Sequence, residues 1–362
     1  MRCQDRTNRL RILLLPWLFL IASVVGQAAV LRVPESFLTI QAAIDQAVSG
    51  DVIEVDALGG PYREAISINQ LDLTIRAVNG TAMIDGREVG RLVEFGGRMV
   101  PIVVEIAGNA IRFSGFEVRG DRERGVGILL SGTHRSFLIG NTIRGHLMGV
   151  LFHDTEGSVL MNNTIENNLI GVIMRDARES VVLGNMVRGN GAGLWIQRSD
   201  ENRVVRNTIE ENGNFAIFLT ESNYNTMEGN SIRKNQAGIG LVFSIGNSAQ
   251  ANRIEENGSG IRLLESQGNA IHRNTIAENQ VGIDMESSGW DNLVRWNNIV
   301  DNEQFGVHNV TGMADVTENW WGDPSGPSGE GLGLGDPVST QVEFGSWLKA
   351  PIEIAEFEQV EE

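Results

Sequence analysis

The hydrophobic residues of this chain follow a pattern that repeats every 22 to 24 residues. Each repeat unit contains a small residue, nearly always glycine, that is followed at once by aliphatic side chains. These small residues are Gly127, Gly149, Gly171, Gly193, Ala216, Gly238, Gly260, Gly282 and Gly306. Such even spacing over about 180 residues is typical of proteins built from stacked units that pack only on their neighbours.

Within each unit, large apolar residues stand one and three positions after the small residue, as at Ile128 and Leu130. This alternation has period two and predicts a strand with these side chains inside. Two further apolar columns recur at the same spacing, one starting at Leu138 and the other at Ile143, and each predicts another short strand. Three short strands per unit make one coil of a solenoid, in which neighbouring coils pair as parallel strands about 4.8 Å apart.

Asparagine recurs with the same period at the predicted corners of the coils. One column consists of Asn141, Asn163, Asn185, Asn207, Asn230, Asn252, Asn274 and Asn297. A second consists of His146, Asn168, Asn190, Asn212, Asn235, Asn257, Asn279 and Asn302, and a third changes from serine to asparagine along Ser136, Ser158, Ser180, Asn202, Asn225, Asn247, Asn269 and Asn292. Asparagine tolerates left-handed turns, and its amide can bond the amide one coil away. We therefore interpret these columns as structural ladders.

Different patterns at the two ends predict caps for the solenoid. Residues 39–48 read as a helix with Thr39 as its N-cap and an apolar stripe on the first coil, formed by Ile40, Ala43, Ile44, Ala47 and Val48. Residues 322–337 include nine Gly or Pro in sixteen positions, which predicts a loop without strands. We expect the solenoid and its N-terminal cap over 29–321, this loop over 322–337, and a C-terminal segment with an acidic tail over 338–362.

Residues 1–28 have the form of a secretory signal peptide, cleaved after Ala28. Four arginines precede an apolar run at Ile12–Val25, which is short for a membrane span; an uncleaved anchor is the alternative, against which Pro16 counts. The rest of the chain has 25 basic and 45 acidic residues and no cysteine. We therefore expect a secreted or periplasmic protein with no nucleic-acid partner and no membrane span after cleavage.

Three stretches of the chain resemble the right-handed parallel β-helix proteins of the pectin-lyase-like superfamily, in particular its NosD-like group. They are "TIQAAIDQAVSGDVIEV" at 39–55, "GIRLLESQGNAIHRNTIAEN" at 260–279 and "NWWGDPSGPSGEG" at 319–331. The resemblance covers about residues 30–350 and implies an all-β, single-stranded right-handed parallel β-helix with 22-residue coils and an N-terminal capping helix. It implies little about activity, because the superfamily includes lyases, hydrolases, esterases, epimerases and non-catalytic binders.

The residues two positions after each small residue are expected to face outward. The first five are large and apolar, and they form a row about 20 Å long: Leu129, Leu151, Ile173, Trp195 and Phe218. An exposed apolar row of this length calls for a partner. Three interpretations remain open: a long loop or the C-terminal segment covers the row, the row is a polymer-binding groove with Trp195 and Phe218 as stacking platforms, or it is a subunit contact.

Further along, the same column becomes charged. Arg262, Asp284 and His308 follow one another on successive coils, and Glu286 stands beside Asp284 on its strand. Carboxylates about 5 to 7 Å apart are suited to holding Ca²⁺ or to acting as an acid and a base. The resemblance implies that a lyase of this superfamily would use a basic residue to remove a proton from a calcium-bound uronate, which is a role for Arg262. The alternative is an exposed ladder of opposite charges that contributes little energy.

These observations favour an exported, non-catalytic β-helix that binds a polysaccharide or an exported protein partner along its outer face. We expect no cofactor, with Ca²⁺ at the charged column as the exception left open. The NosD name is associated with copper delivery, but the sequence has no cluster of Met, His or Cys suited to copper. The alternatives are a lyase or epimerase acting on an acidic polysaccharide and a NosD-like periplasmic accessory protein.

Overall fold

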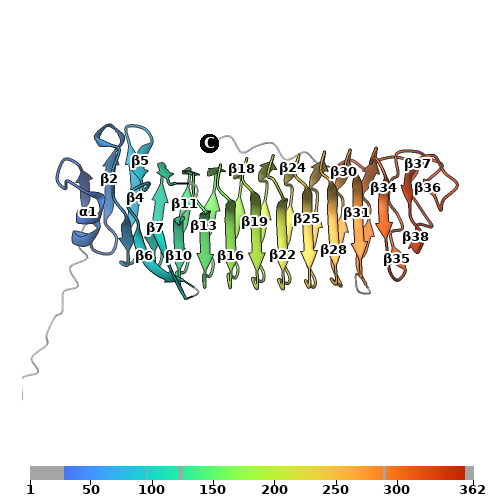
Figure 1. The fold of residues 1–362 in the computed structure, drawn as a ribbon, viewed down its shortest axis with the longest axis horizontal. Helices are drawn as coiled ribbons and strands as arrows, with labels where there is room; N and C mark the ends of the chain where they lie inside the picture. Colours follow the sequence, from blue (N-terminus) through green and yellow to red (C-terminus); the bar gives the residue numbers. More distant parts are fainter. Residues whose placement is uncertain (1–27, 96, 122–124, 288–290, 355–362) are drawn as a thin grey trace, which may run out of the picture.

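The chain forms a long solenoid of three parallel sheets, shown in Figure 1 as a computed structural model. The structure describes residues 28–95, 97–121, 125–287 and 291–354, so the predicted signal peptide lies outside the described residues except for Ala28. In the regular part of the solenoid each coil gives one strand to each sheet. The predicted all-β, right-handed parallel β-helix is therefore confirmed.

Each sheet runs along the length of the solenoid. Sheet A contains β1 (Val30–Val33), β2 (Val52–Asp56), β4 (Thr74–Val78), β8 (Arg112–Ser114), β11 (Phe137–Ile139), β14 (Val159–Met161), β17 (Val181–Leu183), β20 (Arg203–Val205), β23 (Thr226–Glu228), β26 (Ser248–Gln250), β29 (Ala270–His272) and β32 (Leu293–Arg295). Sheet B contains β5 (Ala82–Asp85), β9 (Phe116–Arg119), β12 (Thr142–Arg144), β15 (Thr164–Glu166), β18 (Met186–Arg188), β21 (Thr208–Glu210), β24 (Ser231–Arg233), β27 (Arg253–Glu255), β30 (Thr275–Ala277) and β33 (Asn298–Val300).

Sheet C is the widest and carries the column of candidate site residues. Its strands are β3 (Ile66–Ile68), β7 (Arg98–Ile106), β10 (Val126–Ser131), β13 (Met148–His153), β16 (Ile170–Arg175), β19 (Ala192–Gln197), β22 (Phe215–Thr220), β25 (Ala237–Val242), β28 (Ser259–Leu264), β31 (Val281–Glu286), β34 (Phe305–Asn309), β37 (Gly335–Val338) and β36 (Pro327–Gly329). Strand β6 (Arg91–Phe95) pairs antiparallel with β7 and makes a hairpin at the side of this sheet. A separate pair consists of β35 (Ala314–Asp315) and β38 (Val342–Glu343).

The predicted apolar columns line the interior of the solenoid. Leu138 pairs with Leu160 in sheet A, Ile143 with Ile165 in sheet B, and all four side chains are fully buried. The repeated small residue is needed for space: a Cβ on Gly149 would lie 2.5 Å from the backbone oxygen of Gly171 in the next coil. In each regular coil one side chain from sheet A, one from sheet B and two from sheet C are buried, and together they give a continuous core that stabilises the solenoid without disulfides.

The asparagine columns form the predicted ladders. Asn163 donates its backbone N–H to Oδ1 of Asn185 at 2.9 Å and its Nδ2 to the same oxygen at 3.0 Å, and the pattern continues from coil to coil. The left-handed backbone geometry is not at the ladder asparagines themselves. The residue one position earlier makes the turn, and the asparagine side chain therefore points inward. The residues with positive φ at the corner between sheets A and B are Gly140, Asn162, Gly184, Arg206, Gly229, Ala251, Arg273, Trp296 and Glu318.

The predicted helix is α1 (Ile40–Gln46), and it packs at the N-terminal end of the solenoid. Thr39 Oγ1 accepts the backbone N–H of Ala42, as expected of an N-cap. The helix ends before Val48, which is 65% exposed, so this residue does not belong to the buried stripe. Within the described residues, no helix is long and apolar enough to cross a membrane.

The C-terminal end differs from the prediction in one respect. Residues 322–337 were expected to lack strands, but they contain β36 and the first residues of β37. Glycine and proline are tolerated there because β36 is the edge strand of sheet C, with one neighbour, and β37 pairs with β34 only at Val338. Trp321 is fully buried beneath this end, and the chain then returns, with Leu348 donating its N–H to the backbone oxygen of Asn319.

Candidate functional site

The outward column of sheet C has the predicted register. Pairing between neighbouring strands runs without a shift along Leu129, Leu151, Ile173, Trp195, Phe218, Gly240, Arg262, Asp284 and His308. Asp284 and His308 are therefore neighbours, although a longer sequence step separates their coils. The environment of the column changes along the solenoid, so its three parts are described separately.

The first part is covered. Leu129, Leu151 and Ile173 are 2%, 1% and 4% exposed, and they form a small apolar cluster outside the main core. Val93 of β6 and Val100 of β7 pack against this cluster. The three residues were expected to be open to a ligand, and this expectation is wrong: the β6–β7 hairpin covers them, as the first of the three interpretations allowed. The hairpin covers the cluster because its own apolar side chains are buried when they pack against these three residues.

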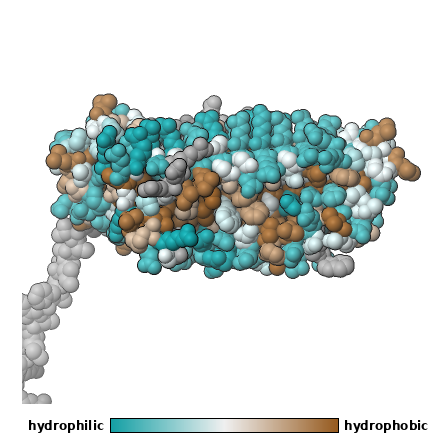
Figure 2. All heavy atoms as spheres, in the orientation of Figure 1, coloured by the Kyte–Doolittle hydropathy of each residue, from teal (hydrophilic) through white to brown (hydrophobic). Residues whose placement is uncertain are grey.

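The middle part is aromatic and partly exposed, and we call it the aromatic face: Trp195, Phe215, Phe218, Gly240 and Arg262. The two phenylalanine rings stack with their centroids 4.5 Å apart, and Trp195 and Phe218 are both half-buried. A Cβ on Gly240 would lie 2.7 Å from the Phe218 ring, so this ring leans over the glycine. Figure 2 looks onto this side of the molecule, where brown apolar patches interrupt the polar surface.

A hydrogen bond fixes the orientation of the indole at this face. Trp195 Nε1 donates to Oγ1 of Thr220 in the next coil at 3.0 Å. The ring is therefore held against the sheet with its polar edge satisfied. An aromatic side chain that is ordered in advance loses little conformational entropy when a ligand stacks on it.

The charged part of the column forms one network. Arg262 Nη2 lies 2.6 Å from Glu286 Oε1, and Arg262 Nε lies 3.8 Å from Asp284 Oδ2. His308 Nδ1 lies 2.9 Å from the other oxygen of Asp284. The structure thus brings all four candidate catalytic residues together, but it pairs them with one another. Both carboxylates that were expected to hold Ca²⁺ are engaged by Arg262, which is the arrangement of the charge-ladder alternative.

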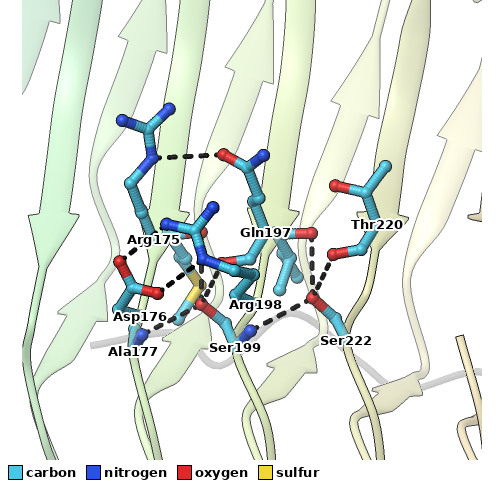
Figure 3. A network of polar contacts seen from close by, with 10 residues as sticks. Arg175, Asp176, Ala177, Gln197, Arg198, Ser199, Thr220 and Ser222 are labelled. Carbon is cyan, nitrogen blue, oxygen red and sulfur yellow. Dashed lines mark hydrogen bonds and ion pairs between the residues drawn. The ribbon is translucent and has the colours of Figure 1, made fainter. Parts of the chain in front are cut away.

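A second polar network lies at the corner that follows sheet C, shown in Figure 3. Arg198 bonds both carboxylate oxygens of Asp176 at 2.9 Å, and this hydrogen bonding lowers the pKa of Asp176. Beneath it, Ser199 Oγ accepts the N–H of Ala177. This inward hydroxyl column continues with Ser222, Ser244 and Ser266, and the sequence reading missed it although its spacing matches the asparagine ladders.

Comparison with known proteins identifies one family. The model of the family described as "Periplasmic copper-binding protein (NosD)" matches residues 103–225 and 213–327. No curated protein matches the chain. Among solved structures, the periplasmic alginate epimerase AlgG matches with a TM-score of 0.53 and 16% identity over 83% of this chain and 76% of its own.

Two further solved structures share the fold. The Dettilon tailspike protein gp208 has a TM-score of 0.55 and 17% identity, covering 75% of this chain and 67% of the tailspike chain. XylC in complex with xylose has a TM-score of 0.56 and 12% identity, covering 72% of this chain and 69% of XylC. At these identities the similarity concerns the β-helix fold alone.

The family description raises the question whether this chain could hold copper. Proteins bind copper through His, Met and Cys side chains. Within the described ranges, no three His, Cys, Asp or Glu residues come close enough to share a metal ion. His146 is buried against the backbone oxygen of Val118, and Met174 and Met227 lie in the main core. The described His, Cys, Asp and Glu residues therefore do not form a preformed copper site.

Proposed function

The chain belongs to the NosD family, and from this premise we propose that it is an exported periplasmic protein that binds a polysaccharide on the aromatic face of sheet C. The proposal keeps Trp195 and Phe218 from the predicted ligand row and replaces the covered residues by Phe215, Gly240 and Arg262. We further propose that the chain is not itself catalytic.

One observation carries the proposal: the apolar column is covered by the β6–β7 hairpin over its first three members and is left open at its two aromatic members. Trp195 and Phe218 occupy neighbouring coils, and Gly240 continues the column without a side chain. A flat aromatic surface matches the apolar face of a sugar ring, and Arg262 at the end of the face adds hydrogen-bond donors.

The mutual pairing of Arg262, Asp284, Glu286 and His308 supports a binding role over a lyase or epimerase role. A proton-abstracting group must reach the substrate, but Arg262 is fixed between Asp284 and Glu286. A guanidinium that is always protonated is also a poor base unless its environment changes. The carboxylates of Asp284 and Glu286 are better suited to holding Arg262 in position at the end of the aromatic face.

A second candidate function follows from the family match. A NosD-like protein could act as an accessory that docks with another exported protein, and the aromatic face is equally suited to a protein surface. The two candidates differ in the ligand, because only the first requires that an isolated glycan bind.

The test is a glycan array probed with residues 29–362, followed by affinity measurements on the best-binding glycan. Trp195→Ala should weaken binding at least about tenfold, as expected for an aromatic residue at the centre of a binding surface. The matched control is Tyr224→Ala, because Tyr224 is an aromatic residue that is 63% exposed outside the face. If no glycan binds, or if both variants bind as well as the wild type, the proposal is wrong. Unsaturated sugar products would contradict the non-catalytic part alone.

A further inference from the structure

A second groove lies away from the aromatic face, at the corner between sheets A and B near the C-terminal end. Its volume is about 660 Å³. The floor comes from the ends of successive sheet A strands and the corner residues that follow them, and the C-terminal segment makes the opposite wall. The lining residues are Glu228, Gln250, Ala251, Arg273, Trp296, Ile352, Glu353 and Ile354.

The wall is held in place by a specific contact. Asn298 donates Nδ2 to the backbone oxygen of Ile352 at 3.0 Å, and its Oδ1 accepts the N–H of the same residue at 3.0 Å. The side-chain amide thus binds the C-terminal segment as a neighbouring strand would. Asn298 is 9% exposed and stands where several earlier coils of sheet B carry threonine, as at Thr208 and Thr275. This departure from the repeat places the wall beside Trp296.

Trp296 is a large residue at a corner of the solenoid. Its φ is 56°, in the left-handed region, where a bulky side chain is disfavoured. The equivalent positions of other coils include glycine and Ala251, and a tryptophan gains nothing there from core packing because its side chain points outward. It is 46% exposed and forms one side of the groove. Tyr224 is also an exposed aromatic residue with positive φ, and Trp296 differs from it in lining the groove beside Arg273.

Arg273 provides a positive charge beside this ring. It stands one coil before Trp296 in the same corner column, and it forms no ion pair with any other residue that the structure describes. Glu228, by contrast, is paired with Arg203 at 3.3 Å. The groove therefore offers a guanidinium without an ion pair among the described residues, an exposed indole and the amide of Gln250, and Glu353 stands on the opposite wall. Guanidinium groups bind carboxylates with paired hydrogen bonds.

We infer that this groove is a second saccharide site, which takes a sugar bearing a carboxylate, with the ring on Trp296 and the carboxylate on Arg273. Trp296 and Arg273 stand on successive coils, whose backbones are about 4.8 Å apart, which is roughly the size of a single pyranose unit. The inference does not depend on the proposed function, because the two surfaces share no residue.

The experiment is isothermal titration of residues 29–362 with trigalacturonate, and with maltotriose as the neutral comparison. Trigalacturonate should bind and maltotriose should bind at least about tenfold more weakly. Trp296→Ala and Arg273→Ala should each weaken trigalacturonate binding at least about tenfold. Both variants should fold, because Ala251 already occupies the equivalent position two coils before Trp296 and one coil before Arg273. Unchanged melting temperatures check this.

Two further variants make the test specific. Asn298→Thr restores the residue common in the repeat and releases the wall, so it should weaken binding as well. Tyr224→Ala, which lies outside both the groove and the aromatic face, should leave the trigalacturonate affinity unchanged. The inference is overturned if trigalacturonate does not bind at millimolar concentration, if maltotriose binds equally well, or if Trp195→Ala rather than Trp296→Ala abolishes binding. Tighter binding by Asn298→Thr would also overturn it, since the C-terminal segment would then obstruct the groove instead of forming it.

Discussion

His146→Asn should make the protein more resistant to mild acid. His146 is the first member of the second ladder, in which the following coils carry asparagine. Its backbone N–H donates to Asn168 Oδ1 at 2.9 Å, and ring Nε2 lies 3.2 Å from the backbone oxygen of Val118. In the next coil, Asn168 Nδ2 donates to the backbone oxygen of Ile143, also at 3.2 Å. The imidazole therefore replaces an amide, with Nε2 protonated as the donor, and asparagine should fit this position.

The magnitude follows from burial of the ring, which is 1% exposed. Desolvation lowers the pKa of His146 from 6.5 to about 4, against a smaller opposing effect of the hydrogen bond to Val118. As the pH falls below 6.5, the unfolded chain takes up a proton at this residue, whereas the folded protein does not until about pH 4. Stability is therefore lost across this window, by about 2 kcal/mol at pH 5 and about 3 kcal/mol at pH 4.

The assay is urea unfolding of residues 29–362, followed by circular dichroism at pH 7.5 and pH 5. The wild type should lose about 2 kcal/mol more unfolding free energy than His146→Asn between these two conditions. The control is His134→Asn, which makes the same exchange at a side chain that is 53% exposed. Equal losses for the wild type and His146→Asn would refute the reasoning, because the ring would then be able to take up a proton inside the folded solenoid.

Four other substitutions test separate parts of the structure. Burial raises the pKa of Asp336, so the contribution of this carboxyl group to stability is present at low pH and lost as the pH rises through that pKa. Asp336→Asn should therefore raise the melting temperature near pH 7 and leave it unchanged near pH 3. Gly149→Ala should cost about 1 to 3 kcal/mol of unfolding free energy, because the new Cβ collides with the next coil. Asn185→Ala leaves the buried backbone N–H of Asn163 without an acceptor, although Nδ2 of Asn163 keeps its bonds to the backbone oxygens of Leu138 and Met161, and should cost about 1 to 3 kcal/mol, measured by urea unfolding. Arg262→Ala should change the unfolding free energy by less than about 1 kcal/mol, because its ion pairs are partly exposed.

The sequence was sufficient to predict the coils, their register and the ladders. Stacking forces equivalent residues into the same environment, so a column such as Leu138, Leu160 and Val182 can be read as buried from its spacing alone. The same logic placed Asp284 beside His308, because parallel pairing fixes which residues are neighbours. The ladder hydrogen bonds followed from residue type and period together.

The remaining features depend on segments outside the repeat. The β6–β7 hairpin has no equivalent in other coils, so its packing over Leu129, Leu151 and Ile173 left no periodic signal. The groove at Trp296 likewise depends on where the C-terminal segment returns. One available signal was overlooked: Trp296 precedes a ladder asparagine, at a position where other coils carry glycine or other small or polar residues.

Hydroxyl-radical footprinting of residues 29–362, with and without the best-binding glycan from the array, tests the central claim most directly. The claim is that the uncovered aromatic part of sheet C is the ligand surface. It predicts that the glycan lowers the oxidation rates of Trp195 and Phe218 and leaves that of Tyr224 unchanged. Equal oxidation of Trp195 and Phe218 in the free and the glycan-bound protein would contradict the claim.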